Sequence, residues 1–101
     1  MGELNKRACK AYNNAVLRKK TSIYNSHKTD VKGLMAEMKE FDEASETKES
    51  KHLPLYTEAE EELADILICC MTELFKRGVN VDNIVDAKME FNEKRVQILG
   101  Q

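Results

Sequence analysis

Residues 57–78 read TEAEEELADILICCMTELFKRG and predict one long helix. At its start, Thr57 and Glu60 form a capping box, in which the Thr57 hydroxyl accepts from a free backbone N–H and Glu60 reaches back. Gly78 is suited to end the helix, because glycine readily adopts the left-handed conformation found after a last turn. Between these ends, apolar residues cover a wide arc of the circumference. A helix with such an arc needs partners on two sides, and three other short helices are not expected to cover it, so we expect a homo-oligomer, either dimer or tetramer.

Three further helices are predicted around this segment. One runs from about residue 3 to 20, and a second begins with Asp30 as its N-cap and fades by about residue 46. The last spans about residues 81–99, after Asn80 or Asp82 as cap. A polar connector with the only proline, Pro54, precedes the helix that opens at Thr57. Short connections between four helices favour an all-α four-helix bundle, with residues 1–101 as a single domain.

Composition supports helices and limits the function classes. Charged residues make up 34% and hydrophobic ones 42% of the chain, with four glycines and one proline. The net charge of −2 gives no support to nucleic-acid binding, which usually shows as a basic excess. A basic run near the N-terminus could contact a polyanion, but we favour a solvated helix face for it. Its residues are Lys6, Arg7, Lys10, Arg18, Lys19 and Lys20.

The three cysteines indicate a reducing compartment. Their odd number, with Cys69 and Cys70 adjacent, argues against a disulfide framework. No apolar run reaches the roughly 20 residues that cross a membrane, and the N-terminus lacks the apolar core of a signal peptide. We therefore expect a soluble protein of the cytoplasm with reduced thiols and no membrane contact.

Two pairs of acidic residues are the candidate metal ligands. Glu37 and Glu40 share one face of the second helix, and Glu62 and Asp65 share one face of the third. Each pair lies at the edge of an apolar face, so packing of the two helices should bring four carboxylates together. Their mutual repulsion would be relieved by divalent cations, and all-oxygen sites suit Mg²⁺, with Mn²⁺ as a substitute. Glu43, three residues further on, is either another ligand or a neighbour of the site.

A polar stripe on the last helix supports this interpretation. Lys88, Asn92 and Arg95 follow the three- to four-residue spacing of one helix face that begins with the apolar Val81. We expect this face to point inward, where the two cations and the amide would bind phosphate oxygens. The alternatives are that both cations extend outward into solvent or pair directly with the glutamates.

These segments resemble the MazG-like, all-α nucleoside-triphosphate pyrophosphohydrolases. The resemblance is carried by GLMAEMKEFDEA (residues 33–44), EEELADILI (60–68) and AKMEFNEKR (87–95), and the connector SKHLPLYTEAEEELAD (50–65) is similar to that of small members. It implies Mg²⁺-dependent hydrolysis of a (d)NTP to the monophosphate and pyrophosphate. The implied metal ligands are Glu37, Glu40, Glu62 and Asp65, and the implied phosphate contacts are Lys88, Asn92 and Arg95.

The resemblance extends to the first helix, where AYNNAVLRKK places Asn14 near the substrate. The first acid of the family's Glu-Glu-x-x-Glu is replaced by Ala36. We assign Glu40 as the general base that activates the attacking water. Two other readings stay open: a non-catalytic helical module that binds a nucleotide or a protein, and a structural bundle stabilised by Ca²⁺ or Mg²⁺.

Overall fold

The computed structural model describes residues 2–99 and is all-α. Within these residues the only β pairing is an isolated antiparallel bridge between Glu49 and Thr57. The predicted all-α class with four helices is confirmed. The helices are α1 (Glu3–Leu17), α2 (His27–Glu43), α3 (Glu58–Lys76) and α4 (Val81–Leu99).

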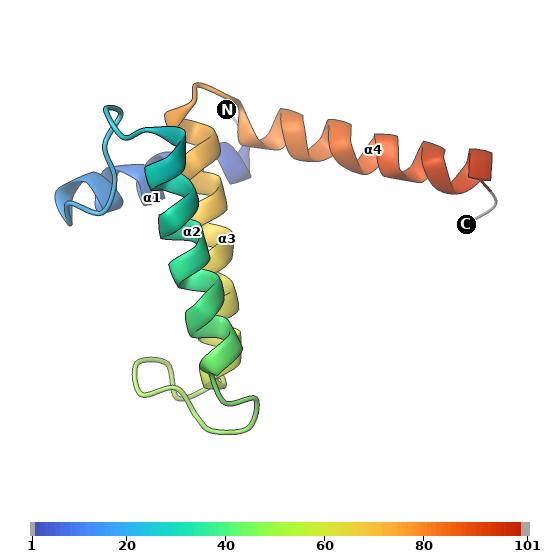
Figure 1. Cartoon of the computed structure of the whole chain (residues 1–101). Helices are drawn as coiled ribbons and strands as arrows, with labels where there is room; N and C mark the ends of the chain where they lie inside the picture. Colours follow the sequence, from blue (N-terminus) through green and yellow to red (C-terminus); the bar gives the residue numbers. More distant parts are fainter. Residues whose placement is uncertain (1, 100–101) are drawn as a thin grey trace.

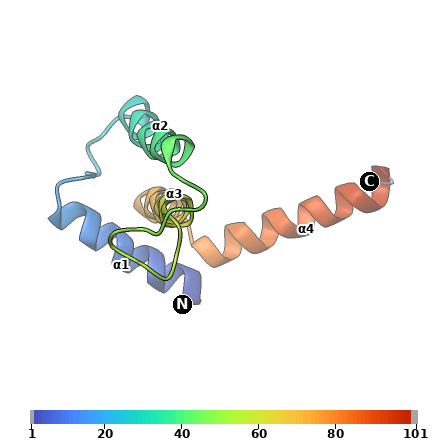
Figure 2. The same ribbon diagram turned by 90° about the horizontal axis from the view of Figure 1, so that it is seen from below.

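Helix α3 lies at the centre, between α1 on one side and α2 on the other (Figure 2). A small core forms where α1, α3 and the start of α4 meet, around the buried Ala8, Met71 and Val81. Tyr12 of α1 packs against Phe75 of α3, with 5.6 Å between their ring centroids. Helix α3 therefore has partners on two sides, but they cover its apolar arc only in part, since Leu63, Leu67 and Ile68 remain exposed.

Both predicted ends of α3 are confirmed. The Thr57 hydroxyl accepts from the Glu60 N–H at 3.1 Å, and the Glu60 carboxylate accepts from the Thr57 N–H at 2.8 Å. At the other end, Gly78 has a φ of +79°. The N–H groups of Gly78 and Val79 donate to the Phe75 and Leu74 carbonyls, which closes the last turn.

The first helix is shorter than predicted, since α1 ends at Leu17 rather than near Lys20. Lys19 adopts a φ of +59°, and the Lys20 N–H donates to the Ala15 carbonyl at 2.8 Å. This left-handed turn is the usual way to satisfy the last carbonyls, although glycine is the more common residue in it.

The predicted cap of the second helix is wrong. Helix α2 begins at His27, with Ser26 as its N-cap, and ends at Glu43. Asp30 instead joins α2 to α3 through ion pairs with Lys76 at 2.6 Å and Arg77 at 3.3 Å. The side chains of Asp30 and Lys76 are only 7% and 6% exposed, so this pair is buried. Burial is the largest single influence on the pKa of Asp30 and raises it, but the hydrogen bonds of Asp30 and the charges of Lys76 and Arg77 together lower this pKa overall.

Helices α1 and α4 cap each other. The Asp82 carboxylate accepts from the N–H groups of Leu4 and Asn5, at 3.1 and 2.9 Å. In return the Asn5 side-chain oxygen accepts from the buried Val81 N–H at 2.9 Å. Asn80 provides the N-terminal side-chain acceptor of α4, for the Asn83 N–H. Past this junction α4 extends away from the other helices (Figure 1).

Large apolar side chains remain exposed in the single chain on all four helices, including Val16 and Leu17 of α1. No helix of the described residues is long and apolar enough to cross a membrane. The larger share of the exposed apolar surface lies on α2, α3 and α4. It comprises Val31, Met35, Met38 and Phe41 of α2, Leu63, Leu67 and Ile68 of α3, and Ile84, Met89, Phe91 and Val96 of α4.

The junction between α1 and α4 predicts the effect of Asn5→Ala. Removing the amide leaves the buried Val81 N–H without its acceptor, which costs about 1–3 kcal/mol. Asn13→Ala is the control, because Asn13 is exposed on the same helix. Urea unfolding should show a lower stability for Asn5→Ala and a change within about 0.5 kcal/mol for the control. Equal stabilities of the two variants would contradict the capping role of Asn5.

Candidate metal centre

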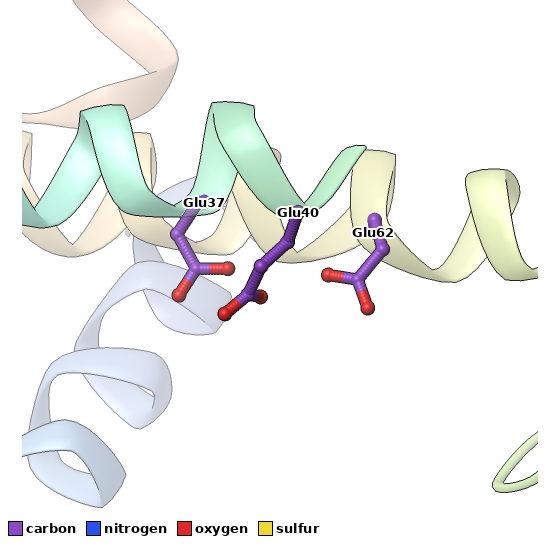
Figure 3. A group of neighbouring side chains, drawn as sticks. All are labelled: Glu37, Glu40 and Glu62. Carbon is purple, nitrogen blue, oxygen red and sulfur yellow. The ribbon is translucent and has the colours of Figure 1, made fainter. Parts of the chain in front are cut away.

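Three carboxylates from two helices meet beside the groove between α1 and α2 (Figure 3). Glu37 and Glu40 come from α2, and Glu62 comes from α3. One oxygen of each lies within 4.8 Å of the other two. Residues three apart share a helix face, which is why Glu37 and Glu40 point the same way. The structure thus brings together three of the four predicted metal ligands.

Glu62 is the most strongly perturbed member of this group. Burial, followed by the neighbouring Glu40 and Asp65 carboxylates, raises the pKa of Glu62 to about 7. Its Oε2 atom is inaccessible to solvent and has no hydrogen-bond partner among the described residues. A buried carboxylate oxygen without a partner is costly. A divalent cation would remove that cost, so the donor set fits a hard metal ion.

Asp65, the fourth predicted ligand, borders the cluster. Its carboxylate lies outside the group of three, but its charge contributes to the raised pKa values of Glu37 and Glu62. Burial is the largest cause of the raised pKa of Glu37, followed by the charge of Glu40. Burial also raises the pKa of Asp65, together with the charges of Glu61 and Glu40. Four acids therefore share one electrostatic environment.

Two nearby acids have other partners. Glu43 is exposed and lies 3.9 Å from Lys39, one turn earlier on the same helix, so it does not join the cluster. Glu61 accepts from the Ser50 hydroxyl and contacts His52 Nδ1 at 3.1 Å. These contacts tie the connector to α3, and they lower the pKa of Glu61. We therefore do not assign Glu43 or Glu61 as metal ligands.

The carboxylates open onto a groove of about 810 Å³ between α1, α2 and α3. Glu37, Glu40 and Asp65 form one wall. Asn14, which the resemblance places near the substrate, lies on the opposite wall. Four cations from α1 and the residues just after it also line the groove, and their sequence pattern alone favoured a solvated helix face. They are Arg7, Lys10, Arg18 and Lys20.

The polar stripe of α4 does not reach this groove. Lys88, Asn92 and Arg95 are all exposed, so the prediction that they face inward is wrong for the single chain. Lys88 Nζ and Arg95 Cζ lie 4.7 and 5.4 Å from the ring centroid of Phe91. The direction of α4 is set by its capping contacts with α1, which the spacing along α4 cannot reveal. A phosphate-binding role of the stripe stays a prediction.

The raised pKa of Glu62 predicts how stability depends on pH. Because the folded-state pKa of about 7 exceeds the ordinary value of 4.5, the protonated carboxyl stabilises the fold at low pH. This contribution is fully present below about pH 4.5 and is lost as the pH rises through about 7. In metal-free buffer, Glu62→Gln should therefore gain stability relative to wild type between pH 5 and pH 8, as measured by urea unfolding.

Glu43→Gln serves as the control, since Glu43 is exposed and its stability difference from wild type should vary little with pH. Mg²⁺ should raise the melting temperature of wild type more at pH 8 than at pH 5.5, because the ligands must be deprotonated. A difference between Glu62→Gln and wild type that is the same at both pH values would contradict the burial of this carboxyl.

Comparison of the chain with protein-family models, with curated proteins and with solved structures finds no match in any of the three. The chemistry of the site therefore rests on the chain's own residues. These are a cluster of unpaired carboxylates and a groove that separates it from a row of cations.

Proposed function

We propose that this protein is a Mg²⁺-dependent nucleoside-triphosphate pyrophosphohydrolase of the MazG-like type. The convergence of Glu37, Glu40 and Glu62 beside an open groove carries the proposal. A groove of about 810 Å³ is in the range of small-molecule sites, which are about 300–1,000 Å³. Its two walls of opposite charge suit a substrate that combines a metal ion with a polyphosphate chain.

The donor set supports Mg²⁺, with Mn²⁺ as a substitute, since every candidate ligand is a carboxylate oxygen. We assign Glu37, Glu40 and Glu62 as ligands and place Asp65 at the edge of the site as the fourth. When bound, Mg²⁺ supplies charge neutralisation to carboxylates and triphosphate and lowers the pKa of a coordinated water. The orphaned Glu62 Oε2 atom is the observation that most directly favours a cation.

The protein's own side chains would then position the nucleotide and activate the attacking water. Glu40 is the exposed member of the cluster and lines the groove, so it can reach a solvent water. We therefore propose Glu40 as the general base that accepts the proton of the attacking water. Asn14, on the facing wall, is placed to hydrogen-bond the nucleotide. The products would be a nucleoside monophosphate and pyrophosphate.

We further propose that the protein works as a homodimer or homotetramer. The exposed apolar side chains of α2, α3 and α4 would be covered by a second copy. Such an assembly offers a way for Lys88, Asn92 and Arg95 to approach a groove, because α4 extends away from its own. The three cysteines form no disulfide, which fits the cytoplasm as the compartment of this activity.

Turnover is tested by measuring pyrophosphate release over the standard and oxidised (d)NTPs with Mg²⁺. At least one nucleotide should yield monophosphate plus pyrophosphate, and chelation should stop the reaction. Glu37→Gln and Asp65→Asn should each lower kcat/KM by about 100-fold or more, because they remove a ligand or its close neighbour. Glu43→Gln, the matched control outside the cluster, should change it less than about twofold.

Release of orthophosphate instead of pyrophosphate would contradict the proposed reaction. Nucleotide binding without any turnover, with Mg²⁺ or Mn²⁺, would favour the non-catalytic binding module over the enzyme. The exposed position of Lys88, Asn92 and Arg95 in the single chain is the observation on which that alternative depends.

The assembly is tested by sedimentation velocity at micromolar concentration, where a dimer or larger species is expected. Leu67→Glu, in the exposed apolar surface of α3, should shift the protein toward monomer. Leu55→Glu is the control, because Leu55 is 92% exposed in the connector and lies outside that surface. A wild-type monomer, or equal assembly of the two variants, would rule out this surface as the subunit contact.

A further inference from the structure

Helix α1 carries a polar row along the side that faces the groove. Arg7, Lys10 and Asn14 of α1 follow the three- to four-residue spacing of one helix face, Arg18 continues it as the C-cap residue, and all four line the groove. The small Ala11 and Ala15 also line it, between the longer side chains. Residues spaced this way lie about 5–6 Å apart, so the row presents charged and polar groups along the groove.

Only some of the basic residues in this part of the chain line the groove. Lys6 and Lys19 belong to the same basic run in the sequence but do not line the groove. Lys20 does line it, because the left-handed turn at Lys19 redirects the chain after α1. The positive charge of Lys20 lowers the pKa values of Glu37 and Asp65, although burial and the neighbouring acids dominate there and raise them. Lys20 is therefore close to the candidate metal centre.

The cations of this wall lack strong partners. Within residues 2–99, Lys10, Arg18 and Lys20 form no salt bridge, and Arg7 lies 3.9 Å from the equally exposed Glu3. Two other acids of the groove, Asp30 and Glu73, are already paired with Lys76 and Arg77. The wall of α1 thus offers several positive charges to whatever occupies the groove.

We propose that Lys10, Arg18 and Lys20, together with Asn14, bind the β- and γ-phosphates of the substrate, which leave as pyrophosphate. This inference rests on the proposed function and assigns the recognition of the leaving group to α1 of the same chain. The carboxylates would hold the metal ion that coordinates the polyphosphate. The cations on the α1 side of the groove would contact the phosphate oxygens directly. Asn14 contributes an amide donor in the middle of the row.

A bare screening role is the competing explanation. In that case the α1 cations would only offset the charge of Glu37 and Asp65, and their loss would change metal binding but not phosphate binding. The lining of the groove favours recognition, because Arg7 and Lys10 line it although neither is among the charges that most affect the pKa values of Glu37 and Asp65.

The test uses inorganic tripolyphosphate with saturating Mg²⁺, titrated into the full chain by calorimetry at fixed ionic strength. Lys10→Gln, Arg18→Gln and Lys20→Gln should each weaken binding by about 10-fold, as expected for loss of one charge-assisted contact. Lys6→Gln and Lys19→Gln are matched controls, which remove the same charge outside the groove. They should weaken binding by less than about twofold. Circular dichroism and the melting temperature confirm that each variant is folded.

The outcomes separate this inference from the proposed function. The phosphate-binding inference is overturned if wild type does not bind tripolyphosphate, or if groove variants and controls bind it equally well. It is also overturned if the groove variants change the affinity for Mg²⁺ but not the affinity for tripolyphosphate. It is equally overturned if Lys88→Gln and Arg95→Gln weaken binding while the α1 variants do not. Nucleotide turnover is measured in parallel. If wild type turns over a nucleotide and the Lys10, Arg18 and Lys20 variants bind tripolyphosphate as wild type does, the proposed enzyme activity is supported and this phosphate site is ruled out. If the groove variants alone lose tripolyphosphate binding and wild type turns over no nucleotide, the phosphate site is supported and the proposed enzyme activity is ruled out.

Discussion

The buried ion pair between Asp30 and Lys76 fixes how α2 lies against α3, and the candidate site depends on that alignment. Glu37 follows Asp30 by about two helical turns, and Asp65 precedes Lys76 by about three, so each acid shares a helix face with one partner of the pair. Further along the same two helices, the charge of Asp65 contributes to the raised pKa of Glu37, so these two carboxyl groups lie near each other. Loss of one partner would leave the other charge buried, which makes this alignment hard to change.

The carboxylate cluster destabilises the fold locally, because its acidic groups are close together and shielded from solvent. Glu37, Glu62 and Asp65 have raised pKa values because they are buried near one another, whereas the other buried charges of α2 and α3 are paired. Natural sequences tend to keep such conflicts only where they serve a function. The contrast is internal to one pair of helices: the same packing satisfies Asp30 and leaves Glu62 Oε2 without a partner. That contrast favours a ligand for the cluster over a purely structural role.

Sequence periodicity predicted the features that depend on neighbours within one helix. The capping box of Thr57, the terminating Gly78 and the shared faces of the acidic pairs all follow from spacings of three or four residues. Features that depend on distant partners were missed. Asp30 and Ser26 are both good N-caps, and the choice between them follows from Lys76, which is far along the chain. The direction of α4 likewise depends on Asp82 and Asn5, whose contacts join the start of α1 to the start of α4.

The basic wall of α1 shows why overall charge is a poor guide to a site. A net charge of −2 averages over a groove whose two sides carry opposite signs. The spacing of Arg7, Lys10 and Arg18 is visible in the sequence, but the face on which they lie gains meaning only from packing. Ala8 is buried and Tyr12 stacks on Phe75, and these contacts orient α1 against α3. The side of α1 that remains then faces the groove. An apolar contact on one face of the helix thus determines which cations meet the carboxylates on the other.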